Sequence, residues 1–270
     1  MTTQTKIIAL SNQKGGVGKT TTAVNLSTAL AACGNKVLVI DFDPQGNTTT
    51  GFGIEKMQAE TNTYTLLMGD SALEDAVCET AVPNLDVVPS TIHLSGAEVE
   101  LVSVLARETR LKDALAPALG VYDYVFIDCP PSLGLLTINA FVASKYVLIP
   151  LQCEFFAMEG LSQLFKTMEI VRKSLNQQLE LLGVLLTMYD KRNNLAAQVE
   201  ADVREHLGAK VLETVIPRNV RLSEAPSHGV PGLIYDMKCT GSQAYIKLAA
   251  ELMRKFTAMT QPTTETKEAA

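Results

Sequence analysis

The residues best placed for chemistry lie near the start of the chain, in the run QKGGVGKTT at residues 13–21. The run follows an apolar segment of strand length and precedes a helical pattern, so its backbone N–H groups can wrap a phosphate at a helix N-terminus. The ammonium of Lys19 can then bind the β- and γ-phosphates of a nucleotide, and the hydroxyl of Thr20 can ligate Mg²⁺. We therefore predict a site for ATP and Mg²⁺ in a phosphate-binding loop that is formed by Lys14, Gly15, Gly16, Val17, Gly18, Lys19, Thr20 and Thr21.

The loop departs from the pattern GxxxxGK[ST] at its first position, where Gln13 replaces glycine and Lys14 follows it. The residues alone do not fix the role of this additional lysine, and the simple interpretation is a solvated surface lysine.

Two carboxylates follow other apolar runs of strand length. Asp43 lies in the segment DFDPQGN at residues 41–47, whose proline, glycine and asparagine suit a mobile loop, and it can position an attacking water. Asp128 ends the run YVFID and precedes CPPS, a Walker B arrangement in which it can hold Mg²⁺ through the water shell of the ion, opposite Thr20. We predict a metal site made by Thr20, Asp43 and Asp128. Taken alone, either acid could instead cap a neighbouring backbone turn or helix.

These residues need a scaffold that brings several strand ends together. The strand candidates are residues 6–11, 36–41, 85–89, 124–129, 146–151, 181–188 and 211–216. The helix candidates are residues 20–33, with Gly34 as the residue that ends the helix, and residues 94–119, 135–143, 159–176, 195–207 and 242–256. The strand runs are continuously apolar, as in strands covered on both faces, and they alternate with helices. The pattern predicts an α/β P-loop NTPase fold: a doubly wound, mostly parallel sheet flanked by helices, with the site at the carboxyl ends of the strands.

Composition sets further limits. At 270 residues, with 47% hydrophobic and 19% charged residues, the chain is expected to form one folded domain at residues 1–257 and a polar tail at residues 258–270. The five scattered cysteines predict neither disulfides nor a metal site. With no long apolar run and no leader, we expect no membrane span and a cytoplasmic location. The net charge of −6 means that binding to DNA would need a local basic patch.

The loop at residues 14–21 resembles the deviant Walker A loop of the ParA/MinD superfamily. DFDPQGN and YVFIDCPPS, with residues 187–190 and 216–227, are similar to ParA/Soj-type chromosome and plasmid partition ATPases, and the likeness spans nearly residues 6–256. The resemblance implies that Lys14 reaches across a nucleotide-sandwich dimer to the phosphates of the partner subunit and that Asp43 orients the hydrolytic water. Lys14, Lys19 and Asp43 would then be the catalytic residues. It further implies adenine contacts from Pro217 and Asn219 and DNA contacts from Arg192 and Arg221.

The same resemblance implies a function: a slow ATPase whose ATP-bound homodimer binds DNA without sequence preference. A ParB-type centromere-binding protein would stimulate hydrolysis and release the dimer from nucleoid DNA. The composition supports this mildly, because residues 190–256 hold ten lysines and arginines against eight acids.

Other functions remain open. A MinD-like membrane-associated ATPase would need a C-terminal amphipathic helix on lipid. The C-terminal segment does have an apolar face at helical spacing, formed by Tyr245, Leu248, Ala249, Leu252, Met253 and Phe256. The opposite face of that helix is not strongly basic, so packing of the apolar face onto the sheet is favoured. A nitrogenase-reductase type would need a cysteine pattern that the chain lacks, and a metabolic P-loop enzyme would leave Lys14 without a role.

Overall fold

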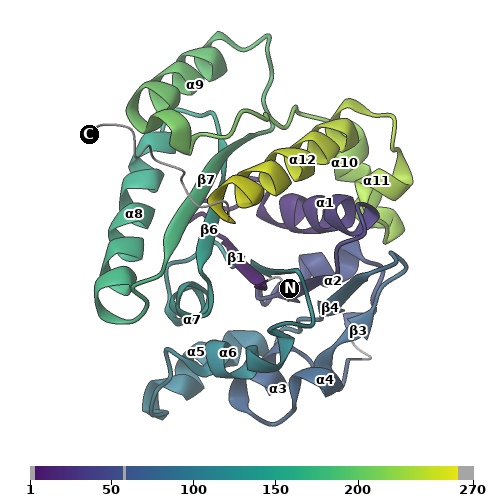
Figure 1. Cartoon of the computed structure of the whole chain (residues 1–270), viewed down its shortest axis with the longest axis vertical. Coiled ribbons are helices and arrows are strands. Elements are labelled where there is room, and N and C mark those ends of the chain that lie inside the picture. Colours follow the sequence, from purple (N-terminus) through teal and green to yellow (C-terminus); the bar gives the residue numbers. More distant parts are fainter. Residues whose placement is uncertain (1–3, 57–58, 261–270) are drawn as a thin grey trace, which may run out of the picture.

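A twisted sheet of seven strands runs through the molecule (Figure 1), in the order β3-β4-β2-β5-β1-β6-β7. The computed structural model describes residues 4–56 and 59–260. The strands are β1 (Lys6–Leu10), β2 (Val37–Asp41), β3 (Cys78–Glu79), β4 (Leu85–Val88), β5 (Tyr124–Asp128), β6 (Tyr146–Gln152) and β7 (Glu180–Thr187). Neighbouring strands are parallel except that β3 pairs with β4 in the antiparallel direction. The predicted doubly wound, mostly parallel α/β sheet is therefore confirmed.

The sheet is covered by helices on both faces, and side chains alternate between two hydrophobic cores. In β1, Ile7 and Ala9 belong to one core, and Ile8 and Leu10 belong to the other. This double burial explains why the strands read as continuous apolar runs rather than as an alternation. The helices are α1 (Lys19–Ala32), α2 (Asn47–Gly51), α3 (Thr63–Met68), α4 (Leu73–Ala76), α5 (Leu94–Glu100), α6 (Arg110–Ala114), α7 (Leu135–Ala143), α8 (Ala157–Ser174), α9 (Asn194–Leu207), α10 (Val220–Glu224), α11 (Gly232–Tyr235) and α12 (Thr240–Thr260).

One face of the sheet is covered by α1 and α12, which pack against each other (Figure 1). Helix α1 ends as the sequence predicts, because Gly34 has a φ of +85° and its N–H donates to the carbonyl oxygen of Ala31 at 2.9 Å. On α12, the side chains of Tyr245, Leu248 and Phe256 are buried. Burying such a side chain stabilises the fold by roughly 1.5–3 kcal/mol, so the apolar face of α12 is used in the core. Within the described residues, no helix is long and apolar enough to cross a membrane.

The carboxyl ends of β1, β2 and β5 meet at one edge of the sheet. Asp128 is in register with Leu10 of β1 on one side and with Asp41 of β2 on the other. The phosphate loop begins directly after β1, and the two acidic loops begin at the ends of β2 and β5. Parallel pairing therefore gathers the three sequence motifs at a single place, as the fold class requires.

One predicted strand, residues 211–216, is wrong. This segment runs beside β7, and its N–H groups of Leu212 and Ile216 donate to the Val184 and Leu186 oxygens of that strand. The Ile216 oxygen accepts from the N–H of Tyr189, just beyond the end of β7. Between Leu212 and Ile216, the N–H groups of Glu213 and Thr214 donate to the carboxylate of Glu251 on α12. A side chain from another element thus replaces the ladder that a strand would need.

The predicted helix at residues 94–119 is also wrong as a single element. It divides into α5, a 3₁₀ turn at Leu101–Ser103, α6 and a second 3₁₀ turn at Ala116–Ala118. Ala106 has a φ of +55°, which no helix interior allows, and Pro117 lacks a backbone N–H. At the C-terminus, α12 continues to Thr260, so the first three residues of the predicted tail are helical. The rest of that predicted tail, residues 261–270, lies outside the described residues.

Candidate active site

The phosphate-binding loop joins β1 to α1 in a conformation that depends on glycine. Gly16 has a φ of +74° and Gly18, the N-cap residue of α1, has a φ of +88°. Side chains rarely adopt this left-handed region, so glycine is required at both positions. The loop is anchored from β7, because the hydroxyl of Thr187 donates to the carbonyl oxygen of Val17 at 2.8 Å. The N-terminus of α1 thus opens into the loop, as a phosphate site needs.

Lys19 points into the hollow of the loop. Its side chain is buried, and its Nζ donates to the carbonyl oxygens of Asn12 at 3.1 Å and of Lys14 at 3.2 Å. Burial lowers the pKa of Lys19, and the nearby carboxylate of Asp128 opposes that shift. The Asn12 side chain fixes the start of the loop, since it donates to the Pro150 oxygen and accepts from the N–H of Lys14. An anionic phosphate in the loop would give this buried ammonium a charged partner.

Asp128 and Thr20 lie together at the entrance to α1. The hydroxyls of Thr20 and Thr48 both donate to Oδ2 of Asp128 at 2.8 Å, and the carboxyl group is buried. Among the described residues, Oδ1 of Asp128 has no hydrogen-bond partner. Burial raises the pKa of Asp128 to about 6, because a buried carboxylate without a full set of partners favours the neutral form. A hydroxyl beside a buried carboxylate oxygen without a partner suits Mg²⁺, so these residues fit the predicted ion.

Asp41 supports the site from the end of β2. Its Oδ2 accepts hydrogen bonds from the N–H of Thr49 at 2.8 Å and from the hydroxyl of Thr49 at 2.6 Å. Burial and the neighbouring charge of Asp128 raise the pKa of Asp41 to about 7. These bonds hold the start of α2 against the strand end. Thr48, on the same short helix, is therefore held within hydrogen-bonding distance of Asp128.

Asp43 is placed differently from the other acid of the predicted metal site. Its Oδ1 accepts from the N–H of Gln45 at 2.9 Å, and its carbonyl oxygen accepts from the N–H of Gly46 at 2.9 Å, so it caps its own turn. Its charge still contributes to the raised pKa of Asp128. Across residues 4–56 and 59–260, no three His, Cys, Asp or Glu side chains form a metal-binding group. Thr20 and Asp128 are thus brought together, whereas Asp43 lies nearby without contacting either.

Lys14 is directed to a partner outside the phosphate loop. Its ammonium forms an ion pair with the carboxylate of Glu154, just after β6, and both side chains are about half exposed. Its backbone oxygen still accepts from Lys19. The structure therefore separates the two loop lysines: Lys19 is buried in the loop, and Lys14 is available at the surface.

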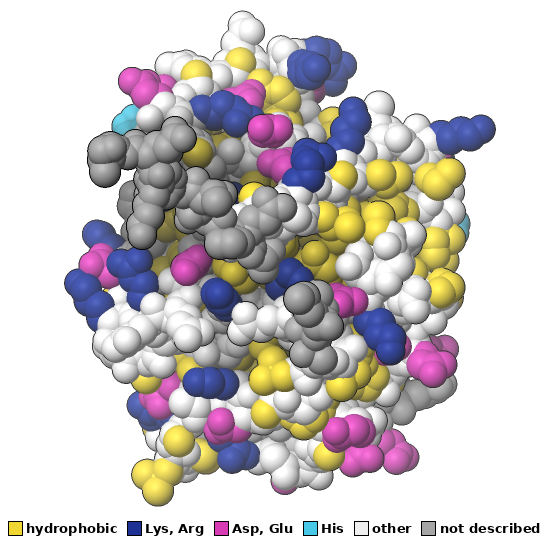
Figure 2. Space-filling model, in the orientation of Figure 1, with side chains coloured by type: hydrophobic (Ala, Val, Ile, Leu, Met, Phe, Trp, Pro, Cys, Tyr) yellow, Lys and Arg dark blue, Asp and Glu magenta, His cyan; other side chains and the backbone are white. Residues whose placement is uncertain are grey.

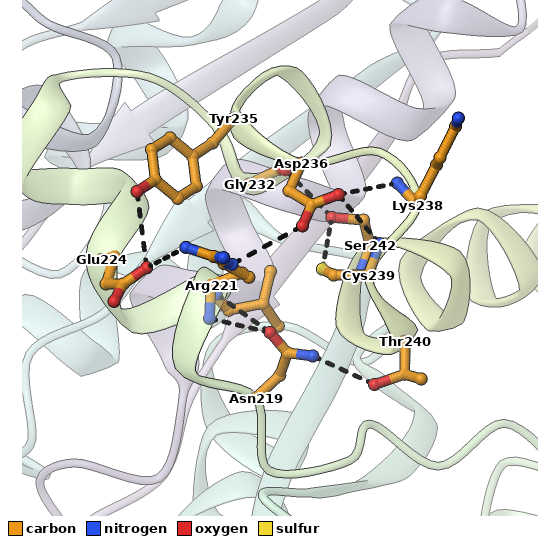
Figure 3. A network of polar contacts seen from close by, with 11 residues as sticks. Asn219, Arg221, Glu224, Gly232, Tyr235, Asp236, Lys238, Cys239, Thr240 and Ser242 are labelled. Atoms are coloured by element: carbon orange, nitrogen blue, oxygen red, sulfur yellow. Dashed lines mark hydrogen bonds and ion pairs between the residues drawn. The ribbon is translucent and has the colours of Figure 1, made fainter.

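The turn that contains Pro217 and Asn219 lies beyond the end of β7. The Asn219 side chain caps α10 by accepting from the N–H groups of Arg221 and Leu222, and it donates to Thr240 at 3.0 Å (Figure 3). Pro217 pairs with Tyr189 and lines a cavity of about 1230 Å³.

That cavity is rich in cations, which are Lys191, Arg192, Arg218, Lys238 and Lys247, and its acidic residues are Asp190, Glu200 and Glu213. The sequence did not single out Lys191, Lys238 and Lys247 individually, because they come from separate segments and belong to no motif. Its lining therefore holds more cationic than acidic side chains, in a chain whose net charge is −6.

The two predicted DNA-binding arginines are not side by side in the cavity. Arg192 lines it and forms two bonds to Asp190, from Nε at 3.0 Å and from Nη2 at 2.8 Å, which lower the pKa of Asp190 to about 2. Arg221 lies outside the cavity lining and is drawn between Glu224 at 3.0 Å and Asp236 at 3.7 Å (Figure 3). Both guanidinium groups are exposed, so phosphates could compete for them with their present carboxylate partners.

The fold and the loop chemistry define a P-loop ATPase. The chain matches the family described as "AAA domain" over residues 5–181. It is 59% identical to "Chromosome partitioning protein ParA" of Caulobacter vibrioides over 252 residues, which cover 93% of this chain and 94% of that protein. It is 57% identical to "Sporulation initiation inhibitor protein Soj" of Bacillus subtilis over 247 residues, which cover 92% and 98%.

A solved structure is also similar. The crystal structure of cobyrinic acid a,c-diamide synthase from Mycobacterium smegmatis, with a bound ATP analogue and magnesium, has a TM-score of 0.84 and 37% identity and covers 94% of this chain and 97% of that one. The chain belongs to the ParA/Soj family of partition ATPases. It is an ATPase with ATP and Mg²⁺ as its nucleotide and metal, which confirms the cofactors predicted from the loop.

Proposed function

We propose that this chain is the nucleotide-dependent switch of a DNA-segregation system: the ATP-bound homodimer binds DNA without sequence preference, and hydrolysis releases it. The observation that carries the proposal is the position of Lys14, whose ammonium is paired with Glu154 at the surface and is not used within its own loop. A cation in that position can exchange Glu154 for the nucleotide phosphates of a second subunit. ATP binding and dimerisation then become one event.

Within each subunit, the described residues divide the work. Lys19 and the backbone of residues 14–21 would hold the phosphates, Thr20 and Asp128 would hold Mg²⁺, and Pro217 and Asn219 would contact the adenine. The ion, when bound, neutralises charge on the phosphate oxygens. Asp43 orients the attacking water once its loop leaves the turn in which Gln45 is its partner. With no strong general base in the described site, intrinsic turnover is slow, which leaves control to a ParB-type centromere-binding partner.

DNA binding is assigned to the basic cavity and to Arg221. Each subunit offers weak contacts to phosphates, because its cations have carboxylate neighbours. Joining two such surfaces in a dimer raises the effective affinity without new contacts and makes binding depend on ATP. The protein would then reside in the cytoplasm on the nucleoid, as a single ATPase domain that extends to the end of α12 at Thr260.

The membrane-associated alternative receives less support. It needs an apolar helix face that is free to enter lipid, and the corresponding face of α12 is buried in the core, with Leu248 and Leu252 inaccessible to solvent. The remaining described face of α12 would have to bind lipid with little apolar area.

The test is co-sedimentation with DNA in the presence of ATP, ADP or no nucleotide, each with Mg²⁺. We expect retention on DNA with ATP alone and loss of retention at high salt, since the contacts are made to phosphates. Liposomes of anionic lipid serve as the parallel arm. ATP-dependent retention on liposomes, without retention on DNA, would overturn the proposal in favour of a membrane-associated ATPase.

A further inference from the structure

Three apolar side chains, spaced three residues apart, are strongly exposed between the end of α5 and the start of α6. They are Val99 (76% exposed), Val102 (63%) and Leu105 (92%), and we name them the α5 strip. Figure 2 shows hydrophobic side chains protruding at the lower left corner, over this connection. The other large apolar side chain of α5, Leu94, is buried in the core, so α5 is packed in place and the strip is its outward surface. Such a patch on a soluble domain is typical of an interaction site.

The strip is flanked by negative charge that has no cationic partner in the described structure. Glu98 accepts from the N–H of Leu136 at 3.5 Å, and Glu100 accepts from the hydroxyl of Tyr64 at 2.7 Å, so each carboxylate has a neutral donor. The neighbouring cation, Arg107, is held by Glu108 and by the carbonyl oxygen of Val102. The surface therefore combines apolar side chains with uncompensated carboxylates. Its complement is a segment with apolar side chains on one face and lysine or arginine beside them.

The connection that carries the strip is tied to the loop that follows Asp128. Glu98 contacts the N–H of Leu136 in the first turn of α7, and its carboxylate occupies the space where a side chain at Gly134 would lie. Further along, the carbonyl oxygen of Arg107 accepts from the side chain of Asn139, also on α7, at 2.8 Å. The first turn of α7 in turn holds the loop, because the hydroxyl of Thr137 donates to the Ser132 oxygen at 2.6 Å. These bonds connect the segment that carries the strip to the Walker B loop.

The other end of the same segment is tied to the loop that follows β2. Just before α5, the N–H of Ser90 donates to the hydroxyl oxygen of Thr49 at 2.9 Å. That hydroxyl donates to Asp41, and the adjacent Thr48 donates to Asp128. Residues 90–107 therefore connect, by hydrogen bonds, to both acidic loops of the site.

We propose that the α5 strip binds a basic, amphipathic segment of a protein partner, and that this contact changes the rate of ATP hydrolysis through the bonds of Glu98 and Ser90. The inference rests on the proposed function, in which a ParB-type partner stimulates hydrolysis. It adds the surface on which that partner binds and the path by which binding reaches the site. Charge complementarity selects a cationic partner over a second copy of this acidic chain.

The test measures MgATP hydrolysis by the full chain and by three variants, each titrated with the ParB-type protein of the same genome. The double variant Val102→Ser/Leu105→Ser removes exposed apolar contact only, so basal hydrolysis and ATP-dependent retention on DNA stay within about twofold of the original. The partner concentration for half-maximal stimulation rises about tenfold or more, since buried apolar contacts are lost. Ile170→Ser, on the exposed face of α8, is the matched control and leaves stimulation unchanged.

Glu98→Gln separates coupling from binding. It leaves the strip in place but weakens the charged bond to α7, so half-maximal stimulation stays within about twofold while the maximal rate falls about fivefold. Unchanged stimulation of the double variant would overturn the inference. So would loss of its ATP-dependent dimer in the absence of the partner, because the strip would then contact a second copy. If no ParB-type protein stimulates the original chain, the proposed function itself fails and the inference falls with it.

Discussion

The ammonium of Lys14 and the carboxylate of Glu154 form an ion pair that links the phosphate loop to the segment after β6, across 140 positions of sequence. Both side chains are about half exposed, and an exposed pair of this kind contributes only ~0–1 kcal/mol. Lys14 can therefore exchange Glu154 for a stronger anion at little cost. The phosphates of a nucleotide in a second subunit are such an anion.

Replacing Lys14 with alanine is expected to leave ATP binding by the monomer intact and to abolish the dimer. Lys19 and the loop amides still hold the nucleotide, whereas the cation that bridges to the second subunit is missing. Light scattering after size-exclusion chromatography with a non-hydrolysable ATP analogue measures this. Glu154→Gln is the matched control: it frees Lys14 and should dimerise at least as readily as the original chain. Normal dimerisation of the Lys14→Ala variant would refute the trans role of this lysine.

Replacing Lys19 with alanine is expected to lower the affinity of the monomer for ATP. Its buried ammonium is the cation nearest the loop carbonyls, and a hydrogen bond to a charged group is worth roughly 1.5–3 kcal/mol, which corresponds to a loss of about tenfold to a hundredfold in affinity. Titration calorimetry with MgATP gives the constant directly. The Lys14→Ala variant provides the comparison, and equal losses in the two variants would contradict the separation of roles described for the two lysines.

The pH dependence of stability follows from two buried carboxyl groups. Burial raises the pKa of Asp128 to about 6 and that of Asp41 to about 7, whereas both ionise near pH 4 in an unfolded chain. The folded protein therefore binds more protons than the unfolded one between these values. Without nucleotide and Mg²⁺, the contribution of these two groups to the free energy of unfolding is largest below about pH 4 and is lost as the pH rises through 6 and 7, by an amount on the order of 3 kcal/mol for Asp128.

Thermal unfolding between pH 5 and 8 would test this on the full chain and on Asp128→Asn. Asparagine can still accept from Thr20 and Thr48 but does not ionise, so the variant should show a flatter decline with pH. Adding MgATP to the original chain should flatten it too, because the bound cation favours the ionised carboxylate. If the stability of Asp128→Asn declined with pH in parallel with that of the original chain, groups other than Asp128 would cause the pH dependence.

The sheet could be predicted from the sequence because its strands are buried on both faces. The run at 124–129 is an example: every residue of β5 is buried, so nothing interrupts the apolar pattern until Asp128. The segment 211–216 shows the limit of that reasoning. It is apolar enough for a strand, yet Glu251, on a distant helix, takes the N–H groups of Glu213 and Thr214. No local pattern records such a partner.

The candidate site likewise contains residues that the sequence predicts and residues that it does not. The glycines, Lys19, Thr20 and Asp128 follow from a motif whose spacing is local and whose geometry is dictated by one loop and one strand end. Thr48 and Glu154 could not be found that way, because they meet Asp128 and Lys14 from 80 and 140 positions away. The position of Asp43 within its own turn was among the alternatives that the sequence left open. Motifs therefore predict groups that would contact the ligand, and the structure adds the side chains that hold those groups in place.

The last prediction concerns DNA. Arg221 shares its guanidinium between Glu224 and Asp236, so Arg221→Gln removes one cation but also leaves two carboxylates uncompensated at the surface (Figure 3). We expect the variant to dimerise with ATP and to lose about threefold to tenfold in affinity for DNA, with a smaller dependence on salt. In the basic cavity, Lys247→Gln should have an effect of similar size, because Lys247 lines the same cavity as Arg192.

Lys173→Gln is the matched control for both arginine and lysine variants, since Lys173 is exposed on α8 and paired with Glu169, away from the cavity lining. Fluorescence anisotropy with a labelled duplex, at several salt concentrations and with a non-hydrolysable ATP analogue, separates a lost phosphate contact from a lost dimer. A contact to one phosphate per subunit reduces the slope of log affinity against log salt by about two in a dimer. Unchanged slopes in both the Arg221 and Lys247 variants would place the DNA on another face of the molecule.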